Sequence, residues 1–453
     1  MLTIRPRTVI LLACLIEAAW LLVAQTLGSK FLLLPCLACF LVLVAWASLK
    51  GIALPVLLFF LPFAALLKTA PGQTSFFTVA LLITYTVCFL LGYRKIGIIH
   101  VIPAAIVIGL CLLVKTMYGY QLESDFLIFS FSLVFAPYVA IEFGKRYDFF
   151  WLTMFFSIGI ILASISSLYL IEFSNISRYI RDLELFGVVR HSGYYGDPNF
   201  YSAHISAAIA GILILLLNNS KKMRMIQLIV VLMLLTYCGF LAVSKMFTLI
   251  VVCLFLFFVL EVMFKKGKMS LKVFLLLTFV VGTVFLLSFA TSSKLIEMIL
   301  SRFSDSSNIS DFTTGRTDVW LEYFRVFRKD TILLLFGKGF SKIIITTKTS
   351  HNTLIQLVFQ FGLIGFIVFV GWLTCLFRIC LKNNKVEWNT FAQACIILLG
   401  VIGPWLALDM LFFDEMFLMP MYVCIGLNSI AGKEERGNVI ISRRKRLRYG
   451  HGR

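Results

Sequence analysis

Long, solidly apolar runs follow one another along the chain, separated by short polar segments. Runs of this length without period-two alternation predict membrane-spanning helices and exclude a β-barrel. The spans are predicted at residues 8–27, 30–49, 52–67, 76–93, 96–114, 126–143, 149–172, 199–218, 225–243, 246–264, 271–290, 351–377, 388–408 and 411–430. The pattern predicts an all-α polytopic integral membrane protein with about 12–14 transmembrane helices. Pro55 and Pro62 predict that the third span is short and kinked.

Composition agrees with this fold class. Hydrophobic residues make up 60% of the 453 residues and charged residues 14%, against about 45–50% and about 25% in soluble proteins. A single soluble core does not bury so large an apolar share, which excludes a soluble enzyme and a secreted disulfide scaffold. The 11 cysteines sit in apolar runs, so we expect them to be packing residues.

The net charge is +19. The distribution of the basic residues along the chain predicts its orientation in the membrane. Basic residues cluster between spans on one side, which the positive-inside rule makes cytoplasmic, and fourteen spans put both termini there. The clusters are Arg5/Arg7, Lys50, Arg94/Lys95, Lys145/Arg146, Lys221/Lys222/Arg224, Lys265/Lys266/Lys268, Arg378/Lys382/Lys385 and the tail. This distribution favours topology and contact with anionic lipid over binding of nucleic acid.

The apolar run 225–264 must turn back on itself. As one helix it would be about 60 Å long, twice the hydrocarbon core of about 30 Å. Basic clusters flank both ends, so the turn is predicted near Ser244–Lys245 at the external surface.

Four regions are predicted. Residues 1–290 hold the N-terminal transmembrane helices with an external loop at 173–198, and 291–350 form a large external loop. The C-terminal transmembrane helices occupy 351–432, and 433–453 form a basic cytoplasmic tail.

Within the large loop, residues 316–330 are predicted to form an amphipathic helix in the outer membrane interface, capped by Thr313 or Thr314. Its apolar face is predicted to carry Val319, Trp320, Tyr323, Phe324 and Phe327. Gly337 and Gly339 predict a turn after it.

Two predicted helix starts at the external surface carry candidate chemistry. Asp197 is the predicted N-cap and Pro198 the first residue of one span, and Ser350 is the predicted cap of another, with His351 and Asn352 in its first turn. The positive helix end is expected to lower the pKa of His351 and keep its imidazole neutral.

On this topology three cations join His351 at the external face, namely Arg190, Lys245 and Arg316. Such a group suits a lipid-linked phosphate or diphosphate beside a base. Transfer from a diphosphate needs charge stabilisation at the leaving oxygens and a base on the attacking hydroxyl. No phosphate-binding loop, HExxH motif, D-x-D pair or His/Cys cluster is present, so we expect no metal and no cofactor.

Four motifs in fixed order resemble the O-antigen ligase and O-antigen polymerase family over about residues 187 to 370. They are R-H-S-G-Y-Y-G-D-P-N-F-Y-S from Arg190, S-K at Ser244, G-R-T-D-V-W with F-G-K-G-F, and S-H-N before F-G-L-I-G-F. The resemblance implies a membrane glycosyltransferase that uses undecaprenyl-diphosphate-linked glycans on the outer face of the bacterial inner membrane.

The resemblance also assigns roles to residues. Arg190 and Arg316 would bind the diphosphate, and His351 would activate or position the acceptor hydroxyl, which makes these three the catalytic candidates. The further substrate-binding candidates are Lys245, His191, Asp197, Asn199, Asn352 and Arg302. The family often has S-R at the position of Ser244–Lys245. Lysine keeps the positive charge of that arginine but lacks its bidentate fork. Expected partners are the lipid-linked donor and acceptor, membrane lipids and a chain-length regulator.

Several functions remain open at this point. The leading one polymerises lipid-linked repeats into O-antigen, capsular or exopolysaccharide, and the second is a ligase that moves finished glycan to lipid A-core or another acceptor. A peptidoglycan-type polymerase is more distant. A transporter or flippase would be marked by intramembrane acids. The acids of this kind are Glu17, Asp409, Asp414 and Glu415, which are few and lack an inverted-repeat companion.

Overall fold

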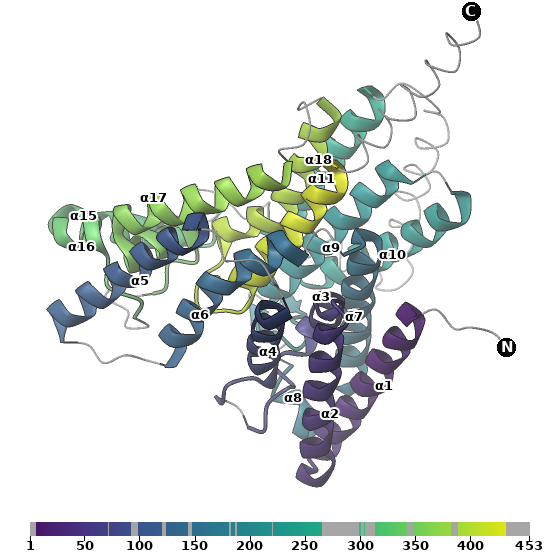
Figure 1. Cartoon of the computed structure of the whole chain (residues 1–453). Helices are drawn as coiled ribbons and strands as arrows, with labels where there is room; N and C mark the ends of the chain where they lie inside the picture. Colours follow the sequence, from purple (N-terminus) through teal and green to yellow (C-terminus); the bar gives the residue numbers. More distant parts are fainter. Residues whose placement is uncertain are drawn as a thin grey trace, which may run out of the picture.

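The structure is a computed structural model. It describes residues 6–70, 72–91, 98–119, 124–143, 147–180, 183–185, 188–219, 221–264, 299, 303, 313–341, 346, 348–381 and 388–431. In these residues ten helices are long and apolar enough to cross a membrane, and three shorter apolar helices accompany them. The protein is an all-α polytopic membrane protein, as predicted (Figure 1).

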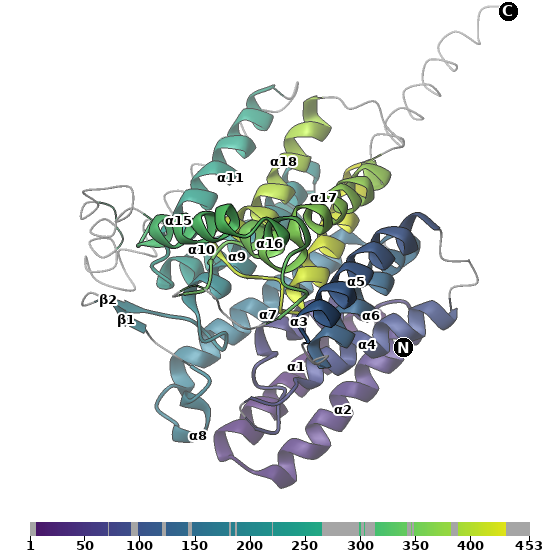
Figure 2. The same ribbon diagram turned by 90° about the vertical axis from the view of Figure 1, so that its left-hand side faces the viewer.

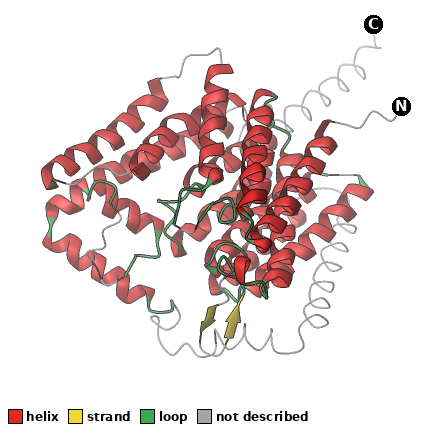
Figure 3. Ribbon diagram, turned by 90° about the horizontal axis from the view of Figure 1, so that it is seen from below, coloured by secondary structure: helices red, strands yellow, loops and turns green. Residues whose placement is uncertain are grey.

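The elements of the first half are α1 (Pro6–Leu27), α2 (Lys30–Leu49), α3 (Ala53–Phe60) with the 3-10 turn η1 (Leu61–Phe63), α4 (Phe76–Leu91), α5 (Ile98–Tyr118), α6 (Ser124–Tyr138) with the π-helical turn η2 (Val139–Phe143), α7 (Phe149–Leu170) and α8 (Ser174–Ser177). A short antiparallel hairpin of β1 (Leu183–Leu185) and β2 (Val188–Arg190) follows, and it lies at one edge of the helices (Figure 3).

The remaining elements are α9 (Pro198–Asn218), α10 (Lys222–Leu241), α11 (Lys245–Phe264), α15 (Arg316–Lys329), α16 (Thr331–Phe336), α17 (Thr353–Leu381) and α18 (Trp388–Ile402) with the 3-10 turn η4 (Gly403–Ala407). A further helix, Glu415–Ala431, is called the C-terminal helix below. The predicted spans match these helices to within a few residues, and the third is short and bent as predicted. The predicted span 271–290 lies outside the described residues.

Helix α9 forms the centre of the bundle. It packs against α7, α10, α11 and α18, and nearly all of its side chains are buried. A helix that is apolar on all sides belongs in the core, and small residues allow the close approach. A Cβ on Gly400 of α18 would lie 2.4 Å from the Cβ of Ala210 and 2.9 Å from the carbonyl oxygen of Ser206. The middle of α9 is therefore packed closely against α18.

Helix α17 is broken at Gly362, whose φ of 66° and ψ of 178° are not helical. The break exposes carbonyls of the first half-helix, and the segment 337–341 binds them. The amide of Lys338 donates to the Phe359 carbonyl, and that of Gly339 donates to the Gln360 carbonyl, both at 2.9 Å. The Gln360 side chain also bonds both backbone groups of Ser341, at 2.7 and 2.8 Å. The F-G-K-G-F sequence thus binds the two residues directly before F-G-L-I-G-F.

Glycine is required where these two backbones meet. A Cβ on Gly337 would lie 2.4 Å from the amide nitrogen of Gly362, and one on Gly362 would lie 2.1 Å from the carbonyl oxygen of Leu335. Gly337 and Gly339 have φ values of 75° and 80°, which confirms the predicted turn and favours glycine.

Phe340 anchors the same segment in the bundle. Its ring is 2% exposed and lies 4.5 Å from that of Phe129 on α6 and 5.0 Å from that of Phe412, centroid to centroid. The ring also stacks on Phe361 of α17. The loop before α17 therefore joins α6, α17 and the segment that leads to the C-terminal helix.

Helix α16 packs along the first half of α17, and α15 lies beside α16 (Figure 2). The amphipathic helix has the predicted bounds to within one residue. Its N-cap is Gly315 and not Thr313 or Thr314, although Thr313 Oγ1 accepts from the Thr317 amide at 3.2 Å. Tyr323 and Phe327 pack on Phe359 of α17. Phe324, predicted on the same apolar face, is 56% exposed, because the buried stripe is narrower than the apolar face.

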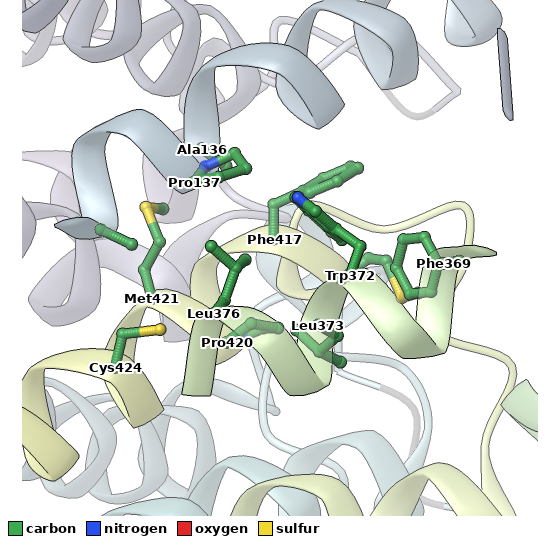
Figure 4. A pocket seen from close by; sticks show the side chains of 12 residues that line it. Ala136, Pro137, Phe369, Trp372, Leu373, Leu376, Phe417, Pro420, Met421 and Cys424 are labelled. Atoms are coloured by element: carbon green, nitrogen blue, oxygen red, sulfur yellow. The ribbon is translucent and has the colours of Figure 1, made fainter. Parts of the chain in front are cut away.

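A small cavity lies between α6, α17 and the C-terminal helix (Figure 4). Its volume is about 20 Å³, and its lining is almost wholly apolar. That space is close to the minimum for a single water molecule. It lies beside Pro137, where α6 gives way to the π-helical turn, and we assign it to imperfect packing there.

Candidate functional site

The start of α9 is built as predicted. Asp197 is the N-cap, its Oδ1 accepts from the Asn199 amide at 2.6 Å, and Pro198 is the first helical residue. The Asn199 side chain then organises two neighbours. Its Oδ1 accepts from Arg190 Nη2 at 3.2 Å and from Ser244 Oγ at 3.0 Å. The helix start thereby joins the hairpin strand β2 to the turn before α11.

Arg190 is held in a fixed orientation. The side chain is 5% exposed, and its Nε donates to the carbonyl of Ala242 at 3.1 Å. Ala242 belongs to the tight turn between α10 and α11, which lies where the length of the run predicted it. A guanidinium fixed at two of its nitrogens is preorganised for an anion, because little side-chain entropy remains to be lost.

The predicted cap of α17 was wrong. The helix begins at Thr353, and Asn352 is the capping residue, since its Oδ1 accepts from the amides of Leu354 at 2.9 Å and Ile355 at 3.2 Å. His351 therefore precedes the helix instead of lying in its first turn. Its backbone is left-handed, with φ of 47°, a conformation that non-glycine residues adopt only when the surroundings hold them.

Asp409 provides that hold. One carboxylate oxygen accepts from Ser350 Oγ at 2.6 Å and the Asn352 amide at 3.1 Å, and the other accepts from the His351 amide at 2.9 Å. Ser350 Oγ also lies 3.0 Å from the carbonyl oxygen of Asn352 and 3.3 Å from its amide, so Ser350 joins Asp409 to the capping residue. The segment from Ser350 to Asn352 is consequently clamped by a carboxylate.

Neighbouring backbone strengthens the clamp. Thr353 Oγ1 donates to the carbonyl of Leu408 and accepts from the Met410 amide, and Gln356 Oε1 accepts from the Leu411 amide. Residues 408–411 therefore lie along the first turn of α17. Asp409 was not predicted as a site residue. In the sequence it is only an acid near the end of a span, and nothing local connects it with His351.

The surroundings of His351 favour a neutral imidazole. Burial, and then the positive charges of Arg316 and Lys348, lower its pKa, while Asp409 and Asp197 raise it, and the net shift is downward from 6.5. The direction agrees with the prediction, but burial rather than a helix end is the main cause. Arg316 and Asp197 therefore lie close enough to His351 to act on its charge.

Arg316 begins α15, and α15 is docked on the His351 segment. Trp320 Nε1 donates to the carbonyl of Ser350 at 2.9 Å, and the Tyr323 hydroxyl donates to that of Lys348 at 3.3 Å. The first turn of α15 is thereby fixed next to the start of α17. The site thus has two halves: one is Arg190 with the start of α9, and the other is His351 with Arg316 and Asp409. Asp197, which caps α9 and acts on His351, links the two halves.

The structure places the other predicted residues less centrally. His191 is buried at 4% exposure, bonds Ser167 of α7 through Nε2 at 2.9 Å and meets the ring of Tyr201 edge-on. Lys245 begins α11 beside Ser244, with its ammonium over the ring of Phe303. Arg302 lies outside the described residues.

An apolar groove adjoins the site. Its volume is about 390 Å³, and it lies between α15, α16 and the first half of α17. Leu354 of its lining is three residues from His351, and Arg328 is its charged member. The full lining is Phe324, Phe327, Arg328, Leu334, Leu354, Ile355, Val358, Leu363 and Phe366. The groove therefore runs along α17 from Leu354, in the first turn, to residues just beyond the break at Gly362.

A second group of acids lies behind the site. Asp414 accepts from Thr78 Oγ1 at 2.7 Å. Burial, assisted by Glu415, raises the pKa of its carboxyl from 3.8 to about 7. The folded state therefore binds this proton more tightly than the unfolded state does.

Stability should accordingly fall as pH rises from about 4 to about 7 and then level off. Asp414→Asn removes this titration and retains an oxygen for Thr78. The melting temperature of the variant should equal that of the wild type near pH 4 and exceed it at pH 8. If thermal unfolding gives the same difference in melting temperature between the variant and the wild type at pH 4 and at pH 8, the raised pKa of Asp414 is contradicted.

Among the described residues no group of three or more His, Cys, Asp or Glu side chains is arranged to hold a metal ion. No known protein family matches the chain, and no curated protein matches it. The site must therefore be interpreted from its own chemistry.

Proposed function

We propose that the protein is a membrane glycosyltransferase that joins polyprenyl-diphosphate-linked oligosaccharide repeats into a polysaccharide. One observation carries the proposal. Four segments far apart in the sequence converge at one end of the bundle. They carry the fixed guanidinium of Arg190, Arg316 at the start of α15, His351, and the Asp409 carboxylate that clamps His351. Fixed cations beside a neutral base suit group transfer from a diphosphate.

The chemistry follows from these groups. His351 takes the proton of an acceptor hydroxyl, and the oxygen attacks the anomeric carbon of the donor sugar. The bond from that carbon to the phosphate oxygen breaks, and the diphosphate leaves with the electron pair. Arg190 and Arg316 stabilise the charge that develops on its oxygens. A neutral imidazole is the form that can accept a proton, and the lowered pKa of His351 supplies it.

The apolar groove supports a lipid-linked substrate. Its lining is apolar except for Arg328, and it begins at Leu354, beside the polar site. A polyprenyl chain in the groove would lie at membrane depth while its diphosphate reached the cations. Anchoring by a part of the substrate that does not react is a common source of positioning energy.

One reconstitution tests the function. Purified protein in detergent receives a polyprenyl-diphosphate-linked repeat alone, with no gradient and no second acceptor. Products of two or more repeats support a polymerase. Transfer that occurs only after lipid A-core is added would identify a ligase, and no transfer with either acceptor would sink the proposal and favour transport.

Arg316→Lys should reduce donor use although it conserves charge. A guanidinium binds two phosphate oxygens through a planar fork, whereas an ammonium acts as a point charge. We expect KM for the donor to rise by about tenfold, which corresponds to roughly the strength of one charge-assisted hydrogen bond. Arg325→Lys, an exposed position on the same helix, is the matched control. Equal KM values for the Arg316 variant and the wild type would contradict the role.

The predicted orientation places the site on the external side of a bacterial inner membrane, with both termini in the cytoplasm. Cysteine introduced at Lys329 should react with an impermeant thiol reagent added outside intact cells, and cysteine at Asn219 should not. Both variants are made in a background without native cysteines. The opposite labelling pattern would reverse the orientation and place the site in the cytoplasm.

A further inference from the structure

A buried acid–base pair lies behind the site, between its two halves. His204 is on α9, seven residues after Asp197, and Glu415 begins the C-terminal helix, six residues after Asp409. His204 Nε2 lies 3.2 Å from Glu415 Oε1. His204 is 2% exposed and Glu415 is 8% exposed. The pair thus connects the helix that holds Arg190 in place with the segment that clamps His351.

The hydrogen bond of Nδ1 fixes which atom of the imidazole faces Glu415. His204 Nδ1 lies 2.7 Å from the carbonyl oxygen of Phe200. A carbonyl only accepts, so Nδ1 carries a hydrogen. Nε2 is then the ring nitrogen that faces the Glu415 carboxylate. Each of these two buried polar groups therefore depends on the other to offset its loss of contact with water.

Other groups pack the pair tightly. The ring of Tyr195 stacks on His204 with centroids 4.4 Å apart and an interplanar angle of 15°. Phe156 of α7 meets the imidazole edge-on. Asp414 precedes Glu415 and is bound to Thr78 of α4. The imidazole cannot rotate away, so a change in Glu415 is transmitted to α9 or to residues 408–414.

We propose that the His204–Glu415 pair positions the two halves of the site relative to each other. The inference rests on the proposed function, because it concerns the distance between Arg190 and His351 during transfer. Neither His204 nor Glu415 contacts the substrate. The pair acts through α9 and Asp197 on one side and through residues 408–414 and Asp409 on the other.

The decisive variant replaces both partners. His204→Phe with Glu415→Leu gives an apolar contact of similar size, and such replacements of buried polar pairs often preserve stability. We expect an unchanged melting temperature, but a fall in kcat between about 10- and 100-fold, since small misplacements of reacting groups have effects of this size. A double variant with wild-type kcat would overturn the proposal, as would a kcat that falls only in step with the folded fraction.

A conservative pair of variants covers the case in which the double variant does not fold. Glu415→Gln keeps the side-chain length and can donate an amide hydrogen to Nε2, so transfer should be largely retained. Glu415→Asp keeps the charge but shortens the side chain and breaks the contact, so kcat should fall. If folded Glu415→Asp has a higher kcat than folded Glu415→Gln, the charge of Glu415 matters and its position does not.

Binding of inorganic diphosphate separates this inference from the proposed function. Arg190 and Arg316 belong to different halves, so the apolar double variant should bind diphosphate about tenfold more weakly than the wild type in calorimetry. Wild-type protein that transfers no glycan would defeat the proposed function alone. Equal diphosphate affinity in wild type and double variant would defeat the positioning role.

Discussion

His351→Ala should abolish glycan transfer by the purified protein while the yield of folded protein stays unchanged. The side chain is the base of the proposed reaction, and loss of a general base typically costs about 10²–10⁴ in rate. Its backbone interactions with Asp409 survive the substitution, since they use the His351 amide. Rates are compared at matched protein concentration over a range of pH. The wild-type rate should persist below pH 6.5, because burial lowers the pKa of His351.

His191→Ala is the informative comparison. His191 bonds Ser167 of α7 and packs on Tyr201, so its loss should lower the melting temperature more than the rate per folded molecule. If fully folded His191→Ala protein transfers no glycan while His351→Ala protein remains active, His191 and not His351 is the base.

Asp409→Ala should reduce transfer nearly as much, even though Asp409 takes no part in the chemistry. The substitution removes the acceptor for the Ser350 hydroxyl and for the amides of His351 and Asn352. Unsatisfied buried donors cost about 1–3 kcal/mol each, so the strained backbone at His351 should relax. We expect lower kcat, with lower stability in thermal unfolding.

Asp409→Asn separates the clamp from general stability. An amide keeps one accepting oxygen but turns an NH₂ group towards a backbone donor, so it should restore part of the stability and little of kcat. Asp318→Asn, an exposed carboxylate on α15, is the control for loss of charge. Wild-type kcat in folded Asp409→Ala would exclude the clamp.

The helices could be predicted from sequence because each span is specified locally. An apolar run of sufficient length forms a helix in the membrane whatever it packs against. The turn before Lys245 followed from the length of its run and from the basic clusters at both ends. The start of α9 was equally local, because Asp197 and Pro198 act on the next few residues.

Contacts between distant segments could not be predicted. Ser350 and Asn352 are both good capping residues, and the choice between them depends on Asp409, 58 residues after His351. Gly362 resembles any glycine in an apolar helix until the segment 337–341 occupies the break. His191 neighbours Arg190 in sequence, but the strand turns its side chain towards α7.

The position of Asp409 also has a consequence for biosynthesis. Arg190, Arg316 and His351 all leave the ribosome before Asp409 does, and His351 has no carboxylate to hold it until the chain beyond α18 has been inserted. A nascent chain can thus carry every proposed catalytic side chain and still be inert. Activity would begin only once insertion reaches the C-terminal helix, so an incompletely inserted protein would not act on the lipid-linked glycans around it.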